Sequence, residues 1–412
     1  MIPVSEITKA RERIESVVVK TPYMKNHNLS EKYNCNVFLK REDMQTVRSF
    51  KIRGAYNKIS SLSDDQRVKG VICASAGNHA QGVAYACAEL SIHGKIYMPN
   101  PTPNQKINKV KHFGKGWVEV VLIGDTYDDA YESALAAQVE HNYTFIHPFN
   151  DRDVIAGQGT IAAEILEQSE VDIDYILVAV GGGGLISGVG SYFKIQSPNT
   201  KIIAVEAKGA PSMQLSIKNN QVTRLDSIDT FADGIAVKEV GDITYSIAMQ
   251  LVDQSILVSE GKICSTILQL YNEEAIVVEP AGAVSIAALD GLADKIVGKN
   301  VAIIICGGNN DIQRTEEIRE RALLYEGRKH YFIIRFPQRA GALRDFLSVL
   351  GKEDDITYFQ YTKKNSRENG PALVGIELDT ENDFNPLLRR MNDQGIIYQH
   401  INDNPMLFEM LV

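Results

Sequence analysis

Short apolar, β-branched runs alternate with helical patterns through residues 35–310, and this alternation constrains the fold more than any other feature. Most runs are continuously apolar, which is typical of parallel strands that are buried on both faces. The pattern therefore predicts an α/β fold with parallel sheets. We expect strands at residues 37–40, 70–75, 95–98, 118–124, 175–180, 201–206 and 301–306, and helices at 80–90, 127–140 and 160–167.

The pattern changes after residue 311. A charged helical pattern at 312–325 suits a connector. The residues that follow predict the strand–helix–strand–strand–helix–strand order of a ferredoxin-like α+β domain, with strands at 330–336, 356–362, 372–378, 396–401 and 406–411 and helices at 342–350 and 385–393. We therefore divide the chain into residues 1–311 (with a smaller subdomain at about 50–150), a connector at 312–328 and a small domain at 329–412.

Composition excludes several classes of function. The 412 residues carry a formal net charge of −9 without a block of Lys or Arg, which argues against nucleic acid or an anionic membrane as a partner. No stretch approaches the roughly 20 apolar residues of a membrane span, and the first residues lack a signal-peptide pattern. Five widely spaced cysteines fit neither a disulfide framework nor a zinc site, so reduced thiols in a cytoplasm are the simplest interpretation.

Residues 49–55 (SFKIRGA) place Lys51 at the expected start of a helix. A lysine that forms a covalent bond must lose its proton near neutral pH, and burial or a nearby cation lowers its pKa. Phe50 and Ile52 offer apolar surroundings, and Arg53 adds positive charge. On these seven residues alone, a surface lysine carries equal weight.

Residues 75–79 (SAGNH) follow an expected buried strand and open a helix. Backbone N–H groups at such a turn bind anions such as a carboxylate. The Ser75 hydroxyl can donate to the same anion, and the Asn78 amide can donate to a phenolate oxygen. The alternative is an ordinary N-cap, and a lone His79 is more often structural than catalytic.

A second loop consists of four consecutive glycines that follow a strand and precede a helical pattern: Gly181, Gly182, Gly183 and Gly184. Glycine lets the backbone close around a phosphate, and the N-terminus of a helix favours the dianion. A Rossmann dinucleotide site is the rival, but the spacing fits only imperfectly, and Glu206 is weak support for it.

Cys306 ends the last strand of the α/β region before a Gly-Gly turn, at the sheet edge where ligands bind. A thiol there can contact a pyridine nitrogen without forcing its protonation, although a buried core cysteine is the commoner case. The four segments in this order describe a site for an aldehyde cofactor with a phosphate tail that is joined covalently to a lysine. That is the logic of a pyridoxal phosphate enzyme.

Together these motifs resemble the fold-type II pyridoxal-phosphate enzymes, with a tryptophan synthase β-like fold, and within them the serine/threonine dehydratases. The whole chain looks like the short-form biosynthetic threonine dehydratases (threonine ammonia-lyases) that carry a C-terminal ACT-like regulatory domain. The resemblance implies β-elimination of L-threonine, and also of L-serine, with 2-oxobutanoate and ammonia as the products from threonine. It further implies a role in isoleucine biosynthesis, feedback by isoleucine, and a cytoplasmic homotetramer.

The resemblance also implies residue roles. Lys51 binds the cofactor covalently and removes the substrate Cα proton. The cofactor-binding positions are Phe50, Lys51, Asn78, Gly181, Gly182, Gly183, Gly184, Leu185, Gly234, Glu279 and Cys306. Those for the substrate carboxylate are Ser75, Ala76, Gly77, Asn78 and His79. In the C-terminal domain, residues 336–343 (FPQRAGAL) carry the ligand-loop pattern, with Ala340 where proline is usual.

Two further matches concern the reaction and an ion. Related serine racemases carry a second acid/base, a serine, where this chain has Ala76, which favours elimination over racemisation. Glu206, Ala210 and Ser212 resemble a cation loop in which enzymes that use a divalent ion have aspartate at the place of Ser212. One carboxylate with neutral oxygens suits a monovalent ion such as potassium (K+) better.

Several alternatives stay open at this level. Cysteine synthase and threonine synthase are disfavoured by Ala76-Gly77 and by the C-terminal domain, and a nucleotide-activated catabolic dehydratase typically lacks that domain. Outside the enzymes, the alternative is an amino-acid sensor with an inactive core, but the intact Lys51, Asn78, glycines 181–184 and Cys306 argue against it. A nucleotide-binding Rossmann protein is the third option. No single side chain reads the methyl group that distinguishes threonine from serine.

Overall fold

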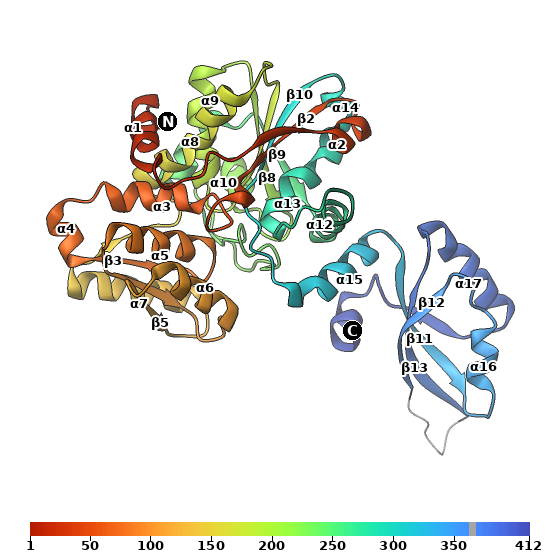
Figure 1. Ribbon diagram of the computed structural model, residues 1–412. Helices are drawn as coiled ribbons and strands as arrows, with labels where there is room; N and C mark the ends of the chain where they lie inside the picture. Colours follow the sequence, from red (N-terminus) through yellow and green to blue (C-terminus); the bar gives the residue numbers. More distant parts are fainter. Residues whose placement is uncertain (362–367) are drawn as a thin grey trace. The chain divides into compact units, whose positions relative to one another are not determined.

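The computed structural model describes residues 1–361 and 368–412, which form two compact units, Met1–Asp311 and Ile312–Val412 (Figure 1). Each unit has its own sheets and its own hydrophobic core. They are therefore described separately.

The larger sheet of the first unit has six strands in the order β1-β2-β10-β7-β8-β9. All pairs are parallel except β1 with β2. Its strands are β1 (Tyr23–Asn26), β2 (Asn36–Arg41), β7 (Tyr175–Ala179), β8 (Lys201–Ala207), β9 (Gln254–Val258) and β10 (Asn300–Ile305). The helices of this part are α1 (Val4–Ile14), α2 (His27–Lys32), α8 (Arg152–Gln168), α9 (Gly184–Gln196), α10 (Ser212–Asn219), α11 (Asp242–Leu251), α12 (Glu260–Glu274), α13 (Pro280–Ala287) and α14 (Ala293–Ile296), with 3-10 turns η1 (Glu42–Met44) and η2 (Ala288–Leu292).

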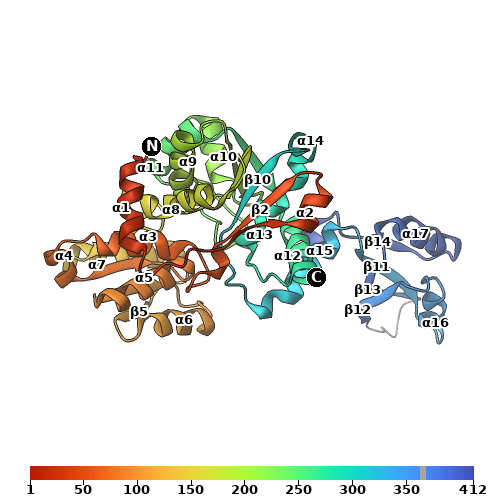
Figure 2. The ribbon, with the colours of Figure 1, turned by 45° about the horizontal axis from the view of Figure 1, so that its top comes forward.

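The smaller subdomain of the first unit is a four-stranded parallel sheet in the order β5-β4-β3-β6. Its helices α3 and α5 pack against each other, as Figure 2 shows, and share an apolar core with α6. The strands are β3 (Val71–Ala74), β4 (Gly94–Met98), β5 (Val118–Leu122) and β6 (Thr144–Phe145), and the helices are α3 (Lys51–Ser60), α4 (Asp64–Lys69), α5 (Asn78–Leu90), α6 (Asn104–Gly114) and α7 (Tyr127–His141).

The second unit contains an antiparallel sheet in the order β12-β13-β11-β14, with α16 and α17 contributing to its core. This order and the chain sequence of elements are those of a ferredoxin-like domain. The strands are β11 (Lys329–Pro337), β12 (Asp355–Tyr361), β13 (Asn369–Glu377) and β14 (Tyr398–His400), and the helices are α15 (Thr315–Tyr325), α16 (Ala342–Leu347), α17 (Phe384–Asp393) and α18 (Pro405–Leu411), with η3 (Ile312–Arg314) and η4 (Glu381–Asp383).

The predicted fold class is confirmed, but one predicted element is wrong. Residues 406–411 were expected to form a strand and form helix α18 instead. Pro405 occupies the first turn of α18, and the Asn404 side chain accepts a hydrogen bond from the Leu407 N–H at 3.2 Å. These are start signals of a helix, and they outweigh the short apolar run. The strand predicted at 356–362 is observed to Tyr361, and Thr362 lies outside the described residues.

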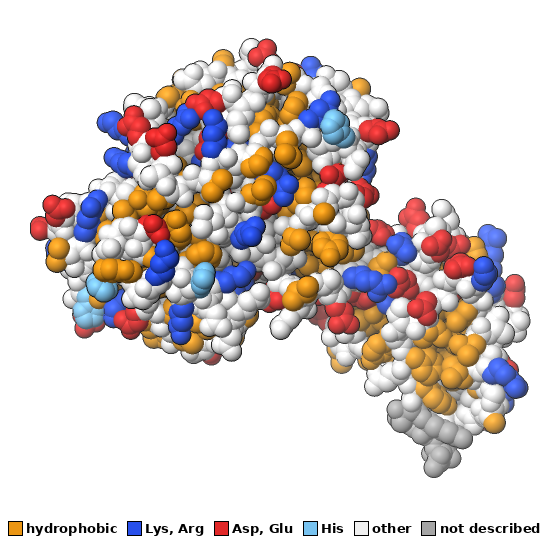
Figure 3. All heavy atoms as spheres, in the orientation of Figure 1, with side chains coloured by type: hydrophobic (Ala, Val, Ile, Leu, Met, Phe, Trp, Pro, Cys, Tyr) orange, Lys and Arg blue, Asp and Glu red, His pale blue; other side chains and the backbone are white. Residues whose placement is uncertain are grey.

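Charged side chains of both signs lie on the surface of the molecule. On the face seen in Figure 3, Lys and Arg side chains are interspersed with Asp and Glu, without a continuous basic patch. Within the described residues, no helix combines the length and the apolar character needed to cross a membrane.

Candidate active site

Lys51 is the first residue of α3, and the chain that leads into it is tied to the end of β10. The Phe50 N–H donates to the Cys306 carbonyl at 3.2 Å, and Ser49 forms a β-bridge with Gly307. Since Cys306 follows β10 directly, these contacts place Lys51 at the carboxyl edge of the larger sheet. Two motifs more than 250 residues apart in the chain are thus brought together.

The Lys51 side chain lies among buried groups. Its Nζ donates to the Pro148 carbonyl at 3.1 Å and lies 5.2 Å from the centre of the Phe50 ring. Burial lowers the pKa of Lys51 to about 8, although the nearby Cys306 and Glu279 act in the opposite direction. A useful fraction of the amine is therefore neutral near physiological pH, as a nucleophile or base requires.

Arg53 does not play the part that the sequence suggested, because its charge is neutralised elsewhere. The guanidinium is fully buried and contacts Glu42 at 2.8 Å and Glu164 at 2.7 Å. Glu164 also accepts from the buried Lys40 at 2.6 Å. This cluster joins α3 to β2, η1 and α8, so Arg53 holds the helix that carries Lys51 rather than lowering its pKa.

The turn at residues 75–79 lies beside Lys51. Asn78 is the first residue of α5, and the Ser75 hydroxyl accepts from the Gly77 N–H at 3.2 Å. Gly82, one turn further along α5, lies against the Lys51 backbone, where an added Cβ would be 3.1 Å from the carbonyl carbon. This close approach of α5 to α3 brings the N-terminus of α5 to the site.

His79 is buried, and its Nε2 lies 2.8 Å from the Ile146 carbonyl. Burial lowers the pKa of His79 to about 3, and the charge of Lys51 contributes to the same effect. The ring is therefore neutral at physiological pH and bonds to the main chain. This environment suits a structural histidine at the edge of the turn.

The four glycines connect β7 to α9, and larger residues would not fit there. Gly183 has φ +92°, a left-handed conformation that favours glycine. A Cβ on Gly182 would overlap the Phe149 ring, and one on Gly181 would lie 2.8 Å from the Ile235 backbone. The buried Leu185 follows in the first turn of α9. The loop and the first N–H groups of α9, which have no partners within the helix, are donors that suit an anion.

Cys306 and Glu279 come later in the chain than the glycines but lie at the same edge of the larger sheet. The Cys306 thiol is buried and donates to the Ala281 carbonyl at 3.1 Å. Burial raises the pKa of Cys306 well above its ordinary value, so the group stays a neutral thiol. Gly234 covers this region, since a Cβ there would lie 2.8 Å from Ala281 and 3.3 Å from Glu279.

The predicted cation loop is adjacent to the glycine loop. Glu206 at the end of β8 is buried and accepts from the Met213 and Gln214 N–H groups, both at 2.8 Å. Burial raises the pKa of Glu206 to about 7. Ala210 and Ser212 are buried close by in sequence, and the Ser212 hydroxyl has no hydrogen-bond partner in the described structure. The described residues contain no cluster of three or more His, Cys, Asp or Glu suited to a metal.

Sequence reasoning missed the segment His147–Asn150, which follows β6. Pro148 accepts from Lys51, and Phe149 lies against Gly182 and Gly184. The His147 Nδ1 accepts from the N–H groups of Phe149 and Asn150 at 3.2 and 2.8 Å and so shapes the loop. The one feature that could have indicated this segment is its place in the chain, directly after a short strand at the carboxyl edge of a parallel sheet.

The residues present fit pyridoxal phosphate. The glycine loop is a cradle that side chains would fill, and it suits a phosphate. The amine of Lys51 has a lowered pKa, the Asn78 amide is a donor, and Cys306 is a neutral thiol. This donor set matches the aldehyde, the ring oxygen and the pyridine nitrogen of the cofactor.

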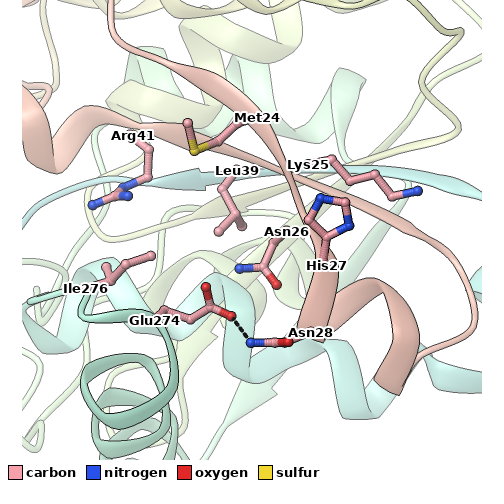
Figure 4. Close-up of a pocket in the computed structure, with 9 residues that line it drawn as sticks. All are labelled: Met24, Lys25, Asn26, His27, Asn28, Leu39, Arg41, Glu274 and Ile276. Carbon is pink, nitrogen blue, oxygen red and sulfur yellow. Dashed lines mark hydrogen bonds between the residues drawn. The ribbon is translucent and has the colours of Figure 1, made fainter.

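A separate hollow of about 350 Å³ lies on the first unit (Figure 4). Within it the Asn28 amide donates to Glu274 at 2.7 Å, and Arg41 pairs with Asp43 at 2.8 Å. The lining residues are Met24, Lys25, Asn26, His27, Asn28, Leu39, Arg41, Glu274 and Ile276. None of them belongs to the predicted site, and we assign this hollow no role.

Comparison with known proteins agrees with the geometry. A family model described as pyridoxal-phosphate dependent enzyme matches residues 14–307, and one described as the C-terminal regulatory domain of threonine dehydratase matches residues 320–411. The chain is 55% identical to the L-threonine dehydratase biosynthetic IlvA of Halalkalibacterium halodurans, over 100% of this chain and 99% of the relative. Its identity to the Bacillus subtilis protein of the same name is 55%, over 100% and 98%.

Solved structures give the same result for the first unit. The processed threonine deaminase isoform 2 of Solanum lycopersicum is 42% identical and has a TM-score of 0.73 over 78% of this chain and 94% of that chain. Maize serine racemase is 33% identical with a TM-score of 0.73, over 79% and 98%. The chain therefore belongs to the pyridoxal-phosphate dependent enzymes, and within them to the biosynthetic L-threonine dehydratases with a C-terminal regulatory domain.

Proposed function

We propose that this chain converts L-threonine to 2-oxobutanoate and ammonia, and L-serine to pyruvate and ammonia. The observation that carries the proposal is the setting of Lys51. Its amine has a lowered pKa and lies where the glycine loop, the Asn78 turn and Cys306 converge. Relatives that match over their whole length carry the name of this activity.

Each group then has a chemical task. The N-terminus of α9 and the glycine loop hold the phosphate, and the N–H groups of the turn at 75–79 hold the substrate carboxylate. Pyridoxal phosphate, when bound, accepts the electron pair that remains after the Cα proton is removed. The neutral amine of Lys51 takes that proton, and the Pro148 carbonyl holds the amine in place. The β-hydroxyl leaves Cβ as water, a loss that balances the proton taken from Cα, and hydrolysis of the resulting enamine releases the 2-oxo acid and ammonia.

Cys306 and Ala76 affect whether elimination or racemisation follows the removal of the Cα proton. A neutral thiol beside the pyridine nitrogen does not force its protonation, which favours prompt loss of the β-hydroxyl over a long-lived carbanion. Ala76 carries no group that could return a proton to the other face of the substrate. Both features favour elimination.

We further propose that the C-terminal domain binds isoleucine. A hollow of about 200 Å³ lies there, over the loop that carries the ligand pattern. Aromatic and aliphatic side chains suit a branched apolar side chain, and Arg339 suits a carboxylate, although it pairs with Asp345 at 2.7 Å. The lining residues are Phe336, Arg339, Gly341, Ala342, Leu343, Phe359 and Tyr361.

The test is to add L-threonine to protein loaded with pyridoxal phosphate and to follow 2-oxobutanoate, with L-serine and L-isoleucine in parallel. Product from threonine that isoleucine suppresses supports both proposals, and Lys51→Ala serves as the inactive control. Phe359→Ala should weaken suppression by isoleucine without changing the rate in its absence. Product untouched by isoleucine would refute the feedback proposal, and cofactor binding without product would refute the reaction.

Three finer proposals complete the assignment. Glu206, Ala210 and Ser212 would hold potassium, so replacing potassium with a bulky organic cation should lower activity or cofactor affinity. The protein would act as a homotetramer, which sedimentation at working concentration tests. Its expected location is the cytoplasm, where fractionation of cells would find it.

A further inference from the structure

The side chains of Asn309, Asn78 and Glu279 form a chain of hydrogen bonds behind the site. Asn309 Nδ2 donates to the Val47 carbonyl at 2.8 Å and to Asn78 Oδ1 at 2.7 Å. Asn78 Nδ2 in turn donates to Glu279 Oε1 at 2.6 Å. Each link joins residues more than 200 positions apart in the chain, so the fold itself assembles this relay.

The direction of these bonds is determined by the main chain. The Val47 carbonyl can only accept, so Asn309 must present its nitrogen on that side. Asn78 must then turn its oxygen toward Asn309 and its nitrogen toward Glu279. A planar amide that is held at both ends cannot rotate by half a turn without losing both bonds.

The Glu279 side chain occupies a space that is open because Gly307 and Gly234 have no side chains. A Cβ on Gly307 would overlap its Oε1, and one on Gly234 would lie 3.3 Å from the same atom. The carboxylate also accepts from the backbone N–H of Asn309. Asn309 therefore contacts both other members of the relay, Asn78 through its side chain and Glu279 through its backbone.

Several charges face Glu279. Burial raises its pKa to about 7, Asp233 acts in the same direction, and Lys106 of α6 acts against it. The carboxylate also raises the pKa of both Lys51 and the Cys306 thiol, which face it. The outer end of the relay is charged too, since Lys109 of α6 donates to Asn309 Oδ1 at 3.1 Å.

We propose that Asn309 and Glu279 are positioning residues that clamp the Asn78 amide, so that one of its two N–H hydrogens stays available for the ring oxygen of pyridoxal phosphate. This inference rests on the proposed function. An unclamped amide presents its oxygen as readily as its nitrogen, and an oxygen facing the anionic ring oxygen repels it. The relay thus determines which end of Asn78 meets the cofactor.

The experiment compares Asn309→Ala with Asn300→Ala. Asn300 is a matched control, because it starts β10 at the far end from the site and donates to the Asp172 carbonyl at 2.8 Å. Titration of apoprotein with pyridoxal phosphate should show about tenfold weaker binding and a shifted absorbance maximum for Asn309→Ala. The control should bind within about twofold of wild type, since nothing near the site changes. An Asn309→Ala protein with wild-type affinity and absorbance would overturn the clamp.

Glu279→Gln provides a second variant in case Asn309→Ala does not fold. Glutamine can still accept from Asn78, but its new NH2 group meets the backbone N–H of Asn309 and its charge is gone. The absorbance of the bound cofactor should change between pH 6 and 8 in wild type and lose this change in Glu279→Gln. Identical pH profiles would overturn the role of Glu279. Because these readouts are binding and absorbance, a wild type that binds the cofactor without forming product refutes only the proposed function.

Discussion

Replacing Lys51 with methionine should make the apoprotein more stable. The buried position of Lys51 disfavours its charged form, because burial lowers its pKa to about 8 from an ordinary 10.5. This difference corresponds to roughly 3 kcal/mol between the charged and neutral forms. Methionine keeps an unbranched apolar chain and carries no charge, so Lys51→Met removes that penalty.

The sign of the pH dependence follows from proton binding. Between pH 8 and 10.5 the unfolded chain keeps a proton on Lys51 that the folded protein has released, so wild-type stability rises with pH in this window. Below pH 8 the whole penalty applies to wild type. The free energy of unfolding of Lys51→Met should therefore exceed that of wild type by up to about 3 kcal/mol at pH 7, and the two should converge by about pH 11.

Urea unfolding followed by tryptophan fluorescence measures this directly. Trp117 is the single tryptophan, and it packs against the core that also contains Ala55 of α3, so it reports on the relevant unit. Lys58→Met on the same helix is the matched control.

Lys58 is expected to behave in the opposite way. Burial disfavours its charge, but pairs with Asp151 at 2.8 Å and Asp153 at 3.0 Å outweigh burial and raise its pKa. Lys58→Met should therefore lose up to about 1 kcal/mol at pH 7. A Lys51→Met variant that gained nothing at pH 7, or gained equally at pH 7 and 11, would refute the reasoning.

Three further predictions concern the surroundings of the site. Arg53→Met leaves Glu42 buried without its main cation, so the free energy of unfolding should fall by about 3 to 5 kcal/mol at pH 7. The loss should be smaller at pH 5, because the Glu42 carboxyl can then take up a proton. Urea unfolding midpoints at both pH values measure this difference. Gly182→Ala forces a methyl group into the Phe149 ring and should weaken cofactor binding by about tenfold to a hundredfold, measured by titration of apoprotein. Ala76→Ser should introduce a second proton donor, and chiral chromatography should detect D-serine formed from L-serine by the variant, with none expected from wild type.

Which strands could be predicted depended on their place in the sheets. Strand β10 is central, and five of its six residues are buried, so its sequence is an uninterrupted apolar run. Strands β1 and β9 lie at the two edges of the same sheet, are less buried, and were not predicted. Strand β6 has only two residues and gives too short a signal. Burial on both faces makes a parallel strand easy to find, but it is not required, because β5 lies at an edge of the smaller sheet, is only partly buried, and was still predicted from its run of valine and leucine.

The site divides in a similar way. Lys51, Asn78, the glycine loop and Cys306 could be proposed from the sequence because each follows a strand or opens a helix, where local sequence determines the backbone. The partners of Arg53 could not, since Glu42 and Glu164 lie 11 and 111 residues away from it and only the packed fold brings them near. The contact between Lys51 and the Pro148 carbonyl could not be predicted either, because every residue has a backbone carbonyl and the residue type does not show which one is used.

The similarity to serine racemases shows why the fold alone does not choose the reaction. The choice depends on which groups can move a proton at the turn of residues 75–79. Ala76 packs against the core of the smaller subdomain and offers no proton, while His79 is neutral and bonded to a main-chain carbonyl. Of Lys51, Ala76 and His79, Lys51 has a side chain whose pKa lies near neutrality. A single base returns a proton only to the face from which it took it, so the proposed roles favour loss of the β-hydroxyl over inversion at Cα.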